Sequence, residues 1–144
     1  MNQNLNPLAV LDHPIYHRLL ELLRLHRFAT TTQLARLTSD GYATARSAVR
    51  QTLRHLNRLL KERLVLHLER RIGGWQGGSS ASIWALTTRG LSALTGQTVR
   101  ARNQAVSTSF LAHLLAITET RTIIDETVRP LPNTTAQIVA EPDC

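Results

Sequence analysis

The chain has 144 residues, of which 42% are hydrophobic and 19% charged, and its formal net charge is +7. This length suits one domain or a small domain with a helical extension, and the composition excludes global disorder. The sequence has no apolar run long enough for a membrane span and no block that resembles a signal peptide, so a cytoplasmic location is expected. Residues 1–102 carry 15 cations and 5 acids, whereas residues 103–144 carry 2 cations and 5 acids, so only the first segment suits a polyanionic partner.

The first predicted element is a helix that follows a polar N-terminal arm, residues 1–13. Pro14 suits the first position of a helix because its missing amide would have no partner there. Apolar residues then recur at helical spacing as far as Arg27 or Phe28. This pattern predicts a helix that packs one face on a core.

A second, short helix is predicted over residues 31–37. Thr30 and Gln33 have the spacing of a capping box, in which each side chain bonds a free amide of the first helical turn. The turn-forming residues 38–41 then separate this helix from the next one.

The third predicted helix, from about Tyr42 to Lys61, is strongly amphipathic. Its expected core face is an apolar stripe of Val49, Leu53, Leu56 and Leu60, with Ala45 close to it. Its other faces carry a row of arginines four residues apart: Arg46, Arg50, Arg54 and Arg58. Like charges at this spacing destabilise an isolated helix by a few tenths of a kcal/mol per pair, so the row is easier to understand if a partner supplies negative charge.

A β-hairpin is predicted next, with strands over 64–72 and 82–86. The segment between them, 73–80, contains four of the seven glycines of the chain and predicts a long, flexible tip. A fourth helix is expected over about 88–94, and Gly96 suits its end.

A C-terminal helix is predicted over residues 103–126, followed by a tail, 127–144. The apolar stripe of this helix consists of Val106, Phe110, Leu114, Ile117 and Ile124. So wide a stripe must be covered. It either folds back on the first helix or pairs with the same helix of a second subunit, and we favour the homodimer.

Three helices, a hairpin and a further helix follow the order of a winged helix-turn-helix domain. The expected fold class is therefore mainly α with a small β-hairpin: a winged helix-turn-helix domain at 14–96 plus a C-terminal helix. In this fold the third helix enters the major groove of double-stranded DNA, and the hairpin tip, the wing, touches phosphate or the minor groove. The residues expected to bind DNA are Thr44, Arg46, Ser47, Arg50, Gln51, Arg54, Arg58, Arg70, Arg71, Trp75 and Gln76.

These residues have different expected roles. Arg70, Arg71 and the arginines of the third helix neutralise phosphates, and the hydroxyl of Thr44 suits a phosphate. The side chains placed to read base edges are Ser47, Gln51 and Arg50 or Arg54, since Gln suits adenine and Arg suits guanine. Trp75 either contacts a sugar or stabilises the hairpin.

Two stretches carry a resemblance to known families. Trp84-Ala85-Leu86-Thr87-Thr88-Arg89-Gly90 resembles the aromatic-x-Leu-Thr-x-x-Gly sequence that closes the wing in MarR-like and PadR-like regulators. A following helix with His113-Leu114-Leu115, and Arg121 further on, is more similar to the replication-relaxation family of plasmids and mobile elements. The resemblance covers about residues 14–124. At the joint where many winged helices have Gly-Leu, this chain has Glu62-Arg63-Leu64.

The resemblance implies DNA binding in plasmid or mobile-element replication, relaxation or transfer, with other replication or transfer proteins as further partners. Transcriptional repression by a MarR-like or PadR-like regulator is the alternative, and both functions would use the same interface. A protein-binding adaptor is a weaker alternative, because the basic segment argues against it.

An enzyme is not expected, since the sequence has no nucleophile elbow, P-loop or GxGxxG motif. No metal or other cofactor is expected either. His13 and His17 lie four residues apart, but Pro14 stands between them and no third ligand is close. The single cysteine, Cys144, excludes an internal disulfide.

Overall fold

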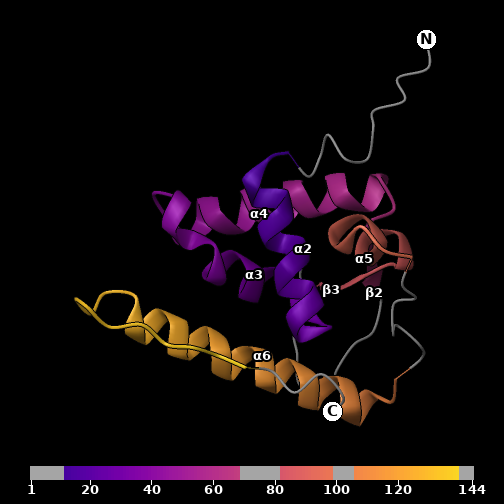
Figure 1. The fold of residues 1–144 in the computed structure, drawn as a ribbon. Helices are drawn as coiled ribbons and strands as arrows, with labels where there is room; N and C mark the ends of the chain where they lie inside the picture. Colours follow the sequence, from indigo (N-terminus) through magenta and orange to yellow (C-terminus); the bar gives the residue numbers. More distant parts are fainter. Residues whose placement is uncertain (1–11, 69–81, 99–105, 140–144) are drawn as a thin grey trace.

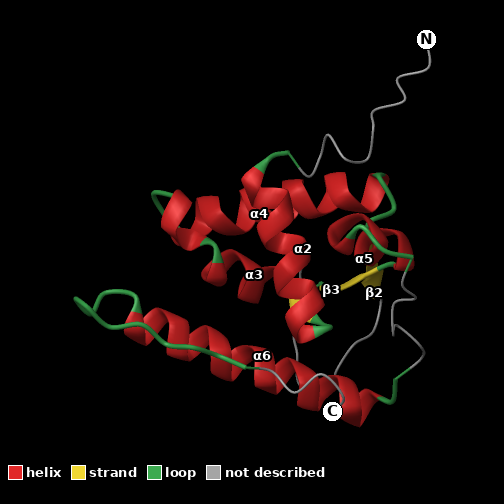
Figure 2. Ribbon diagram, viewed as in Figure 1, coloured by secondary structure: helices red, strands yellow, loops and turns green. Residues whose placement is uncertain are grey.

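The computed structural model describes residues 12–68, 82–98 and 106–139, which form a mainly α-helical fold with a small antiparallel sheet (Figure 1). Their helices are α2 (Pro14–His26), α3 (Thr31–Leu37), α4 (Ala45–Lys61), α5 (Thr88–Thr95) and α6 (Thr108–Val128), with a 3-10 turn, η1 (Ser39–Gly41). Their strands are β1 (Ala29–Thr30), β2 (Val65–Leu68) and β3 (Ile83–Leu86) (Figure 2). The predicted fold class is confirmed, and the element order is consistent with a winged-helix-like fold.

The sheet has the strand order β1-β3-β2, with both pairs antiparallel. The predicted hairpin is present between β2 and β3, where Val65 pairs with Leu86. Strand β1 was not predicted, because two residues carry no periodic signal. It adds an edge to the hairpin by pairing Ala29 with Trp84 and so joins the end of α2 to the sheet.

Capping side chains determine where α2 and α3 begin. Pro14 occupies the start of α2, as predicted, and the side chain of His13 accepts a hydrogen bond from the amide of Ile15. The capping box of Thr30 and Gln33 is also present, and α3 spans the predicted residues.

Helix α4 begins three residues later than predicted. Thr44 is extended, with φ −138° and ψ 156°, and it forms a second reciprocal capping box with Ser47. The backbone before Ala45 is therefore outside the helix. The sequence pattern did not show this second box, because a Ser at the third helical position is a weaker signal than Glu or Gln.

Arg63 occupies the joint at which many winged helices have glycine. Its φ of 60° is in the left-handed region that favours glycine. This conformation lets the amide of Leu64 donate to the carbonyl of Leu59 at 2.9 Å and so ends α4.

The segment Thr87–Gly90, which follows β3, ties α5 to this joint. Thr87 caps α5 by accepting from the amide of Gly90, and its hydroxyl donates to the carbonyl of Arg63 at 2.7 Å. A Cβ on Gly90 would lie 2.0 Å from the carbonyl oxygen of Leu64. The absence of a side chain at Gly90 therefore allows α5 to pass directly over the start of β2.

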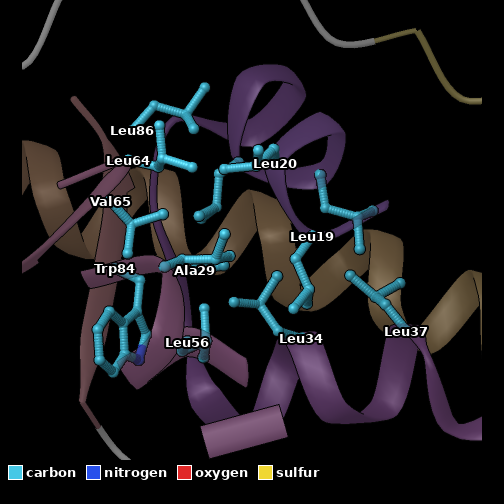
Figure 3. Packing of buried hydrophobic residues seen from close by; sticks show 13 residues of the cluster. Leu19, Leu20, Ala29, Leu34, Leu37, Leu56, Leu64, Val65, Trp84 and Leu86 are labelled. Carbon is cyan, nitrogen blue, oxygen red and sulfur yellow. The ribbon is translucent and has the colours of Figure 1, made fainter. Parts of the chain in front are cut away.

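The first hydrophobic core lies between α2, α3, α4 and the sheet, with Trp84 as its largest member (Figure 3). The indole N–H of Trp84 donates to the hydroxyl of Thr31 at 2.8 Å, so its polar atom is satisfied inside the core. The other members in this core are Leu19, Leu20, Leu22, Leu23, Ala29, Leu34, Leu37, Leu56, Leu59, Leu64, Val65 and Leu86.

The buried face of α4 differs from the predicted apolar stripe. The buried residues are Ala48, Thr52, Leu56 and Leu59. Leu60 is 38% exposed, Ala45 is exposed, and Val49 and Leu53 are only partly buried. Leu56 is buried as predicted and Leu53 packs against the core, but the centre of the predicted stripe was wrong, because the small Ala48 and the polar Thr52 lie on the core face.

Helix α6 packs across α3, β1 and the end of α2 through a second core. There Leu111, Leu114 and Leu115 meet Phe28, Ile83 and Ala85. The fold-back arrangement therefore covers part of the predicted stripe, and Leu114, predicted as a dimer contact, is buried within its own chain. The helix starts at Thr108 instead of 103, because Ser107 is extended and caps it, and it ends at Val128 instead of 126.

Candidate nucleic-acid interface

The exposed side of α4 carries a row of arginines. Within the part of the chain that the structure describes, no carboxylate lies at salt-bridge distance from Arg46, Arg50 or Arg54. All three are exposed. Arg58 has one weak pairing, with Glu62 at 4.0 Å. Three of the four arginines of the predicted row thus have no acidic partner among the described residues, and the fourth has only this weak one.

The first turn of α4 uses its hydroxyl groups for capping. Ser47 Oγ accepts from the amide of Thr44 and donates to the carbonyl of the same residue at 3.0 Å, so its proton is already bound. Thr44 Oγ1 accepts from the amide of Ser47, and none of the described groups accepts its proton. Ser47 is therefore a poor candidate for reading a base, whereas Thr44 keeps a donor for a phosphate.

Gln51 and Arg54 remain as polar side chains in the middle of the helix. Gln51 is half-buried, and no described group is its hydrogen-bond partner. Arg54 is exposed one turn beyond Arg50. These two, with Arg50, are the predicted base-reading residues that α4 leaves available.

A shallow, open hollow lies on the same side of α4. It is lined by Arg46, Val49, Arg50 and Leu53. Two cationic and two aliphatic side chains therefore meet at one place on the surface.

The predicted wing residues Arg70, Arg71, Trp75 and Gln76 lie outside the described residues. The described part of the hairpin is the pairing of β2 with β3. Leu68 pairs with Ile83 in the last described step of the ladder.

The sequence model of the replication-relaxation family matches residues 20–143. The chain belongs to the replication-relaxation family. The resemblance inferred from the sequence is confirmed in this respect, and the match includes α3, α4, the sheet and α6. No curated protein matches the chain, and neither does any solved structure.

In this replication-relaxation protein α6 lies on the opposite side of the molecule from α4 (Figure 1). Its acids Glu119 and Glu126 both bind Arg36 of α3, the first at 2.6 Å. Gln33 adds a hydrogen bond to Glu119 at 3.1 Å. Burial raises the pKa of Glu119, but hydrogen bonds from Arg36 and Gln33 outweigh it and lower the pKa below its usual value.

A buried histidine also connects α2 to α6. His26 is 5% exposed, and its Nε2 accepts from Arg121 at 2.6 Å. Burial, together with the charge of Arg121, lowers the pKa of His26 to about 4, so the ring is neutral near pH 7. Arg121 is the arginine of the helix that resembles the His-x-Leu helix of the replication-relaxation family. In the structure its hydrogen bond to His26 joins α6 to α2.

Sequence reasoning missed this docking surface. Arg36 was counted only as charge and Arg121 only as part of the helix that carries the family resemblance, because their partners are 83 to 95 residues away in the chain. A spacing signal within α6 did exist, since Glu119 and Glu126 are seven residues apart and lie on one face of a helix. No described helix is long and apolar enough to cross a membrane.

Proposed function

We propose that residues 14–96 are a winged helix-turn-helix domain that binds double-stranded DNA, with α4 in the major groove, during replication, relaxation or transfer of plasmid or mobile-element DNA. The observation that carries the proposal is that the exposed residues Arg46, Arg50 and Arg54 of α4 have no acidic partner among the residues that the structure describes. A duplex supplies the missing negative charge at regular intervals, and counterion release then favours binding.

Three roles follow along α4. The hydroxyl of Thr44 and the free amides of the first turn bind a phosphate, because the N-terminus of a helix favours an anion. Arg50, Gln51 and Arg54 reach base edges in the middle of the helix. Arg58, toward the far end, neutralises a phosphate on the opposite wall of the groove.

The predicted wing gives a second argument for this placement. Arg70 and Arg71 stand two and three residues beyond the end of β2 in the sequence, so the predicted hairpin is expected to bring two further cations beside the duplex. Their contribution is expected to be independent of base sequence, because phosphate contacts position a protein without reading the bases.

Titration of the full chain with labelled duplexes at several salt concentrations tests the proposal. If about 6–10 phosphates are contacted, affinity falls by orders of magnitude between about 50 and 200 mM salt. Absence of binding to every duplex at low salt would overturn it.

Variants then separate the two contact regions. Arg50→Ala should cost about 1–3 kcal/mol and relax preference among duplex sequences, whereas Arg71→Ala should weaken all duplexes about equally. If Arg50→Ala left both affinity and preference unchanged while Arg71→Ala abolished binding, α4 would not be the reading helix. A transcriptional repressor would use the same interface, so the family membership is what favours replication.

We also propose that two copies pair through the outer face of α6. Ile117, Ile123 and Ile124 are 38%, 52% and 39% exposed. Apart from Glu126, which binds Arg36, no exposed residue of α6 carries a formal charge at pH 7. Val106 and Phe110, two other predicted contacts, instead pack partly against the second core.

Sedimentation of the full chain at micromolar concentration tests this pairing. A dimer is expected, and Ile117→Glu with Ile124→Glu should convert it to a folded monomer, because the introduced charges would be buried without partners. A wild-type chain that remains a 16.1 kDa monomer with and without duplex DNA would contradict the proposal.

A further inference from the structure

The observed register of α4 leaves two aliphatic side chains beside the arginine row. Val49 and Leu53 are one turn apart and only partly buried. With Arg46 and Arg50 they line the open hollow on α4. Leu53 also packs against the first core, so the floor of the hollow is held in position by the fold.

The hollow combines two chemistries in two parallel rows. Arg46 and Arg50 are one turn apart in the first row, and Val49 and Leu53 are one turn apart in the second. The major groove of DNA presents the complementary pair. Guanine offers two acceptors to an arginine, and thymine offers its 5-methyl group to an apolar side chain.

We propose that Val49 and Leu53 contact the 5-methyl group of a thymine, while Arg46 and Arg50 bind an adjacent guanine or phosphate. The inference rests on the proposed function and deepens it by naming a base. The cationic rim has no described carboxylate beside it, which favours a polyanion over a protein as the occupant. If the arginines contacted only phosphates, the exposed parts of Val49 and Leu53 would have no partner.

The experiment begins with a duplex selected from random sequences by the wild-type full chain. Each thymine is then replaced singly by deoxyuridine, which removes only the methyl group. At one or two positions per bound domain, affinity should fall about fourfold, as expected for exposing one methyl-sized apolar group.

Two variants locate the effect in the protein. Val49→Ala should bind the thymine and deoxyuridine duplexes about equally. Leu60→Ala, which changes another exposed aliphatic residue of α4 outside the hollow, should keep the wild-type ratio. The salt dependence of all three proteins should be the same, because every arginine is retained.

The outcomes distinguish this inference from the proposed function. Salt-dependent duplex binding with no effect of any deoxyuridine overturns the inference alone. Affinity raised by 5-methylcytosine at a cytosine, with no response to deoxyuridine, would assign the hollow to methylated cytosine and overturn it as well. An unchanged ratio in Val49→Ala excludes Val49, and failure to bind any duplex overturns both proposals.

Discussion

The arginines of α4 and those that face α6 belong to the same residue type but have opposite surroundings. Arg46, Arg50 and Arg54 are exposed and have no described acidic partner. Arg36 is held between Glu119 and Glu126, and Arg129 binds Asp125 and the carbonyl of Arg36. The hydrogen bonds that Arg36 donates to Glu126 and Glu119 raise the pKa of Arg36 further above its usual value, so its positive charge is matched within the chain.

The comparison shows that net charge alone does not locate an interface. Glu119 and Glu126 of α6 form ion pairs with Arg36 of the same chain, on the side of the molecule opposite α4 (Figure 1). Matched charges hold one helix against another, whereas unmatched charges are available to a partner. Substitutions on the two sides should therefore affect different measurements.

The largest effect is expected on α4. Replacing Arg46, Arg50 and Arg54 together by Ala should lower duplex affinity more than a hundredfold, since each base or phosphate contact contributes about 1 kcal/mol or more. Stability in urea should stay equal or rise by a few tenths of a kcal/mol, because repulsion along the row is removed. A large loss of stability would show that these arginines have a structural role and would break the comparison.

The next largest effect is expected on the stability of the fold at acid pH, because the buried His26 joins α2 to α6. The pKa of His26 is about 4 in the fold against 6.5 for an ordinary histidine, so the unfolded chain binds this proton first as the pH falls. Stability is full above pH 6.5 and should fall by up to about 3 kcal/mol toward pH 4. Urea unfolding of wild type and His26→Gln over this range measures it. Equal pH dependence of the two proteins would contradict the assignment to His26.

A smaller effect is expected at the matched arginine. Arg36→Ala leaves Glu119 and Glu126 without their partner and should cost about 1–2 kcal/mol in urea unfolding. Duplex affinity of the folded variant should remain within about twofold of wild type, because the side chain binds α6, away from the interface proposed on α4. A large loss of affinity with unchanged stability would place Arg36 in the interface instead.

The smallest effect is expected at Arg63, which is exposed and conformationally unfavourable. Arg63→Gly should raise stability by about 0.5–1 kcal/mol, since glycine adopts positive φ without a Cβ penalty but loses more entropy on folding. Thermal unfolding measures the gain, and Arg63→Ala is the matched control that removes the same charge without relieving the backbone. A gain of equal size in Arg63→Ala would make charge, rather than conformation, the cause.

Local chemistry predicted most of the helices. The capping box of Thr30 and Gln33 and the terminating Gly96 act within a few residues, so they are visible in sequence. The core register of α4 was missed because Thr52 faces the core although it is polar. The partners of Arg36 could not be predicted, since they depend on how α6 crosses α3.

For the candidate site, the arginine row was predicted, and the sequence already indicated that a partner should supply its negative charge; among the described residues only Glu62 comes near it, at 4.0 Å from Arg58. The sequence placed Ser47 among the base-reading residues, whereas the second capping box uses its hydroxyl. The hollow was missed for the same reason as the core register. Val49 and Leu53 were assigned to the core, so no aliphatic surface was expected beside the arginines.

Strand β1 has a mechanical consequence. Thr30 pairs with Ile83 in the sheet and also caps α3, and the amide of Thr31 donates to the carbonyl of Ser82 at 3.0 Å. Strand β3 is therefore connected by a few hydrogen bonds to the first turn of α3, and α3 packs on α4. A shift of β3 relative to α3 and α4 would therefore have to break or bend these hydrogen bonds.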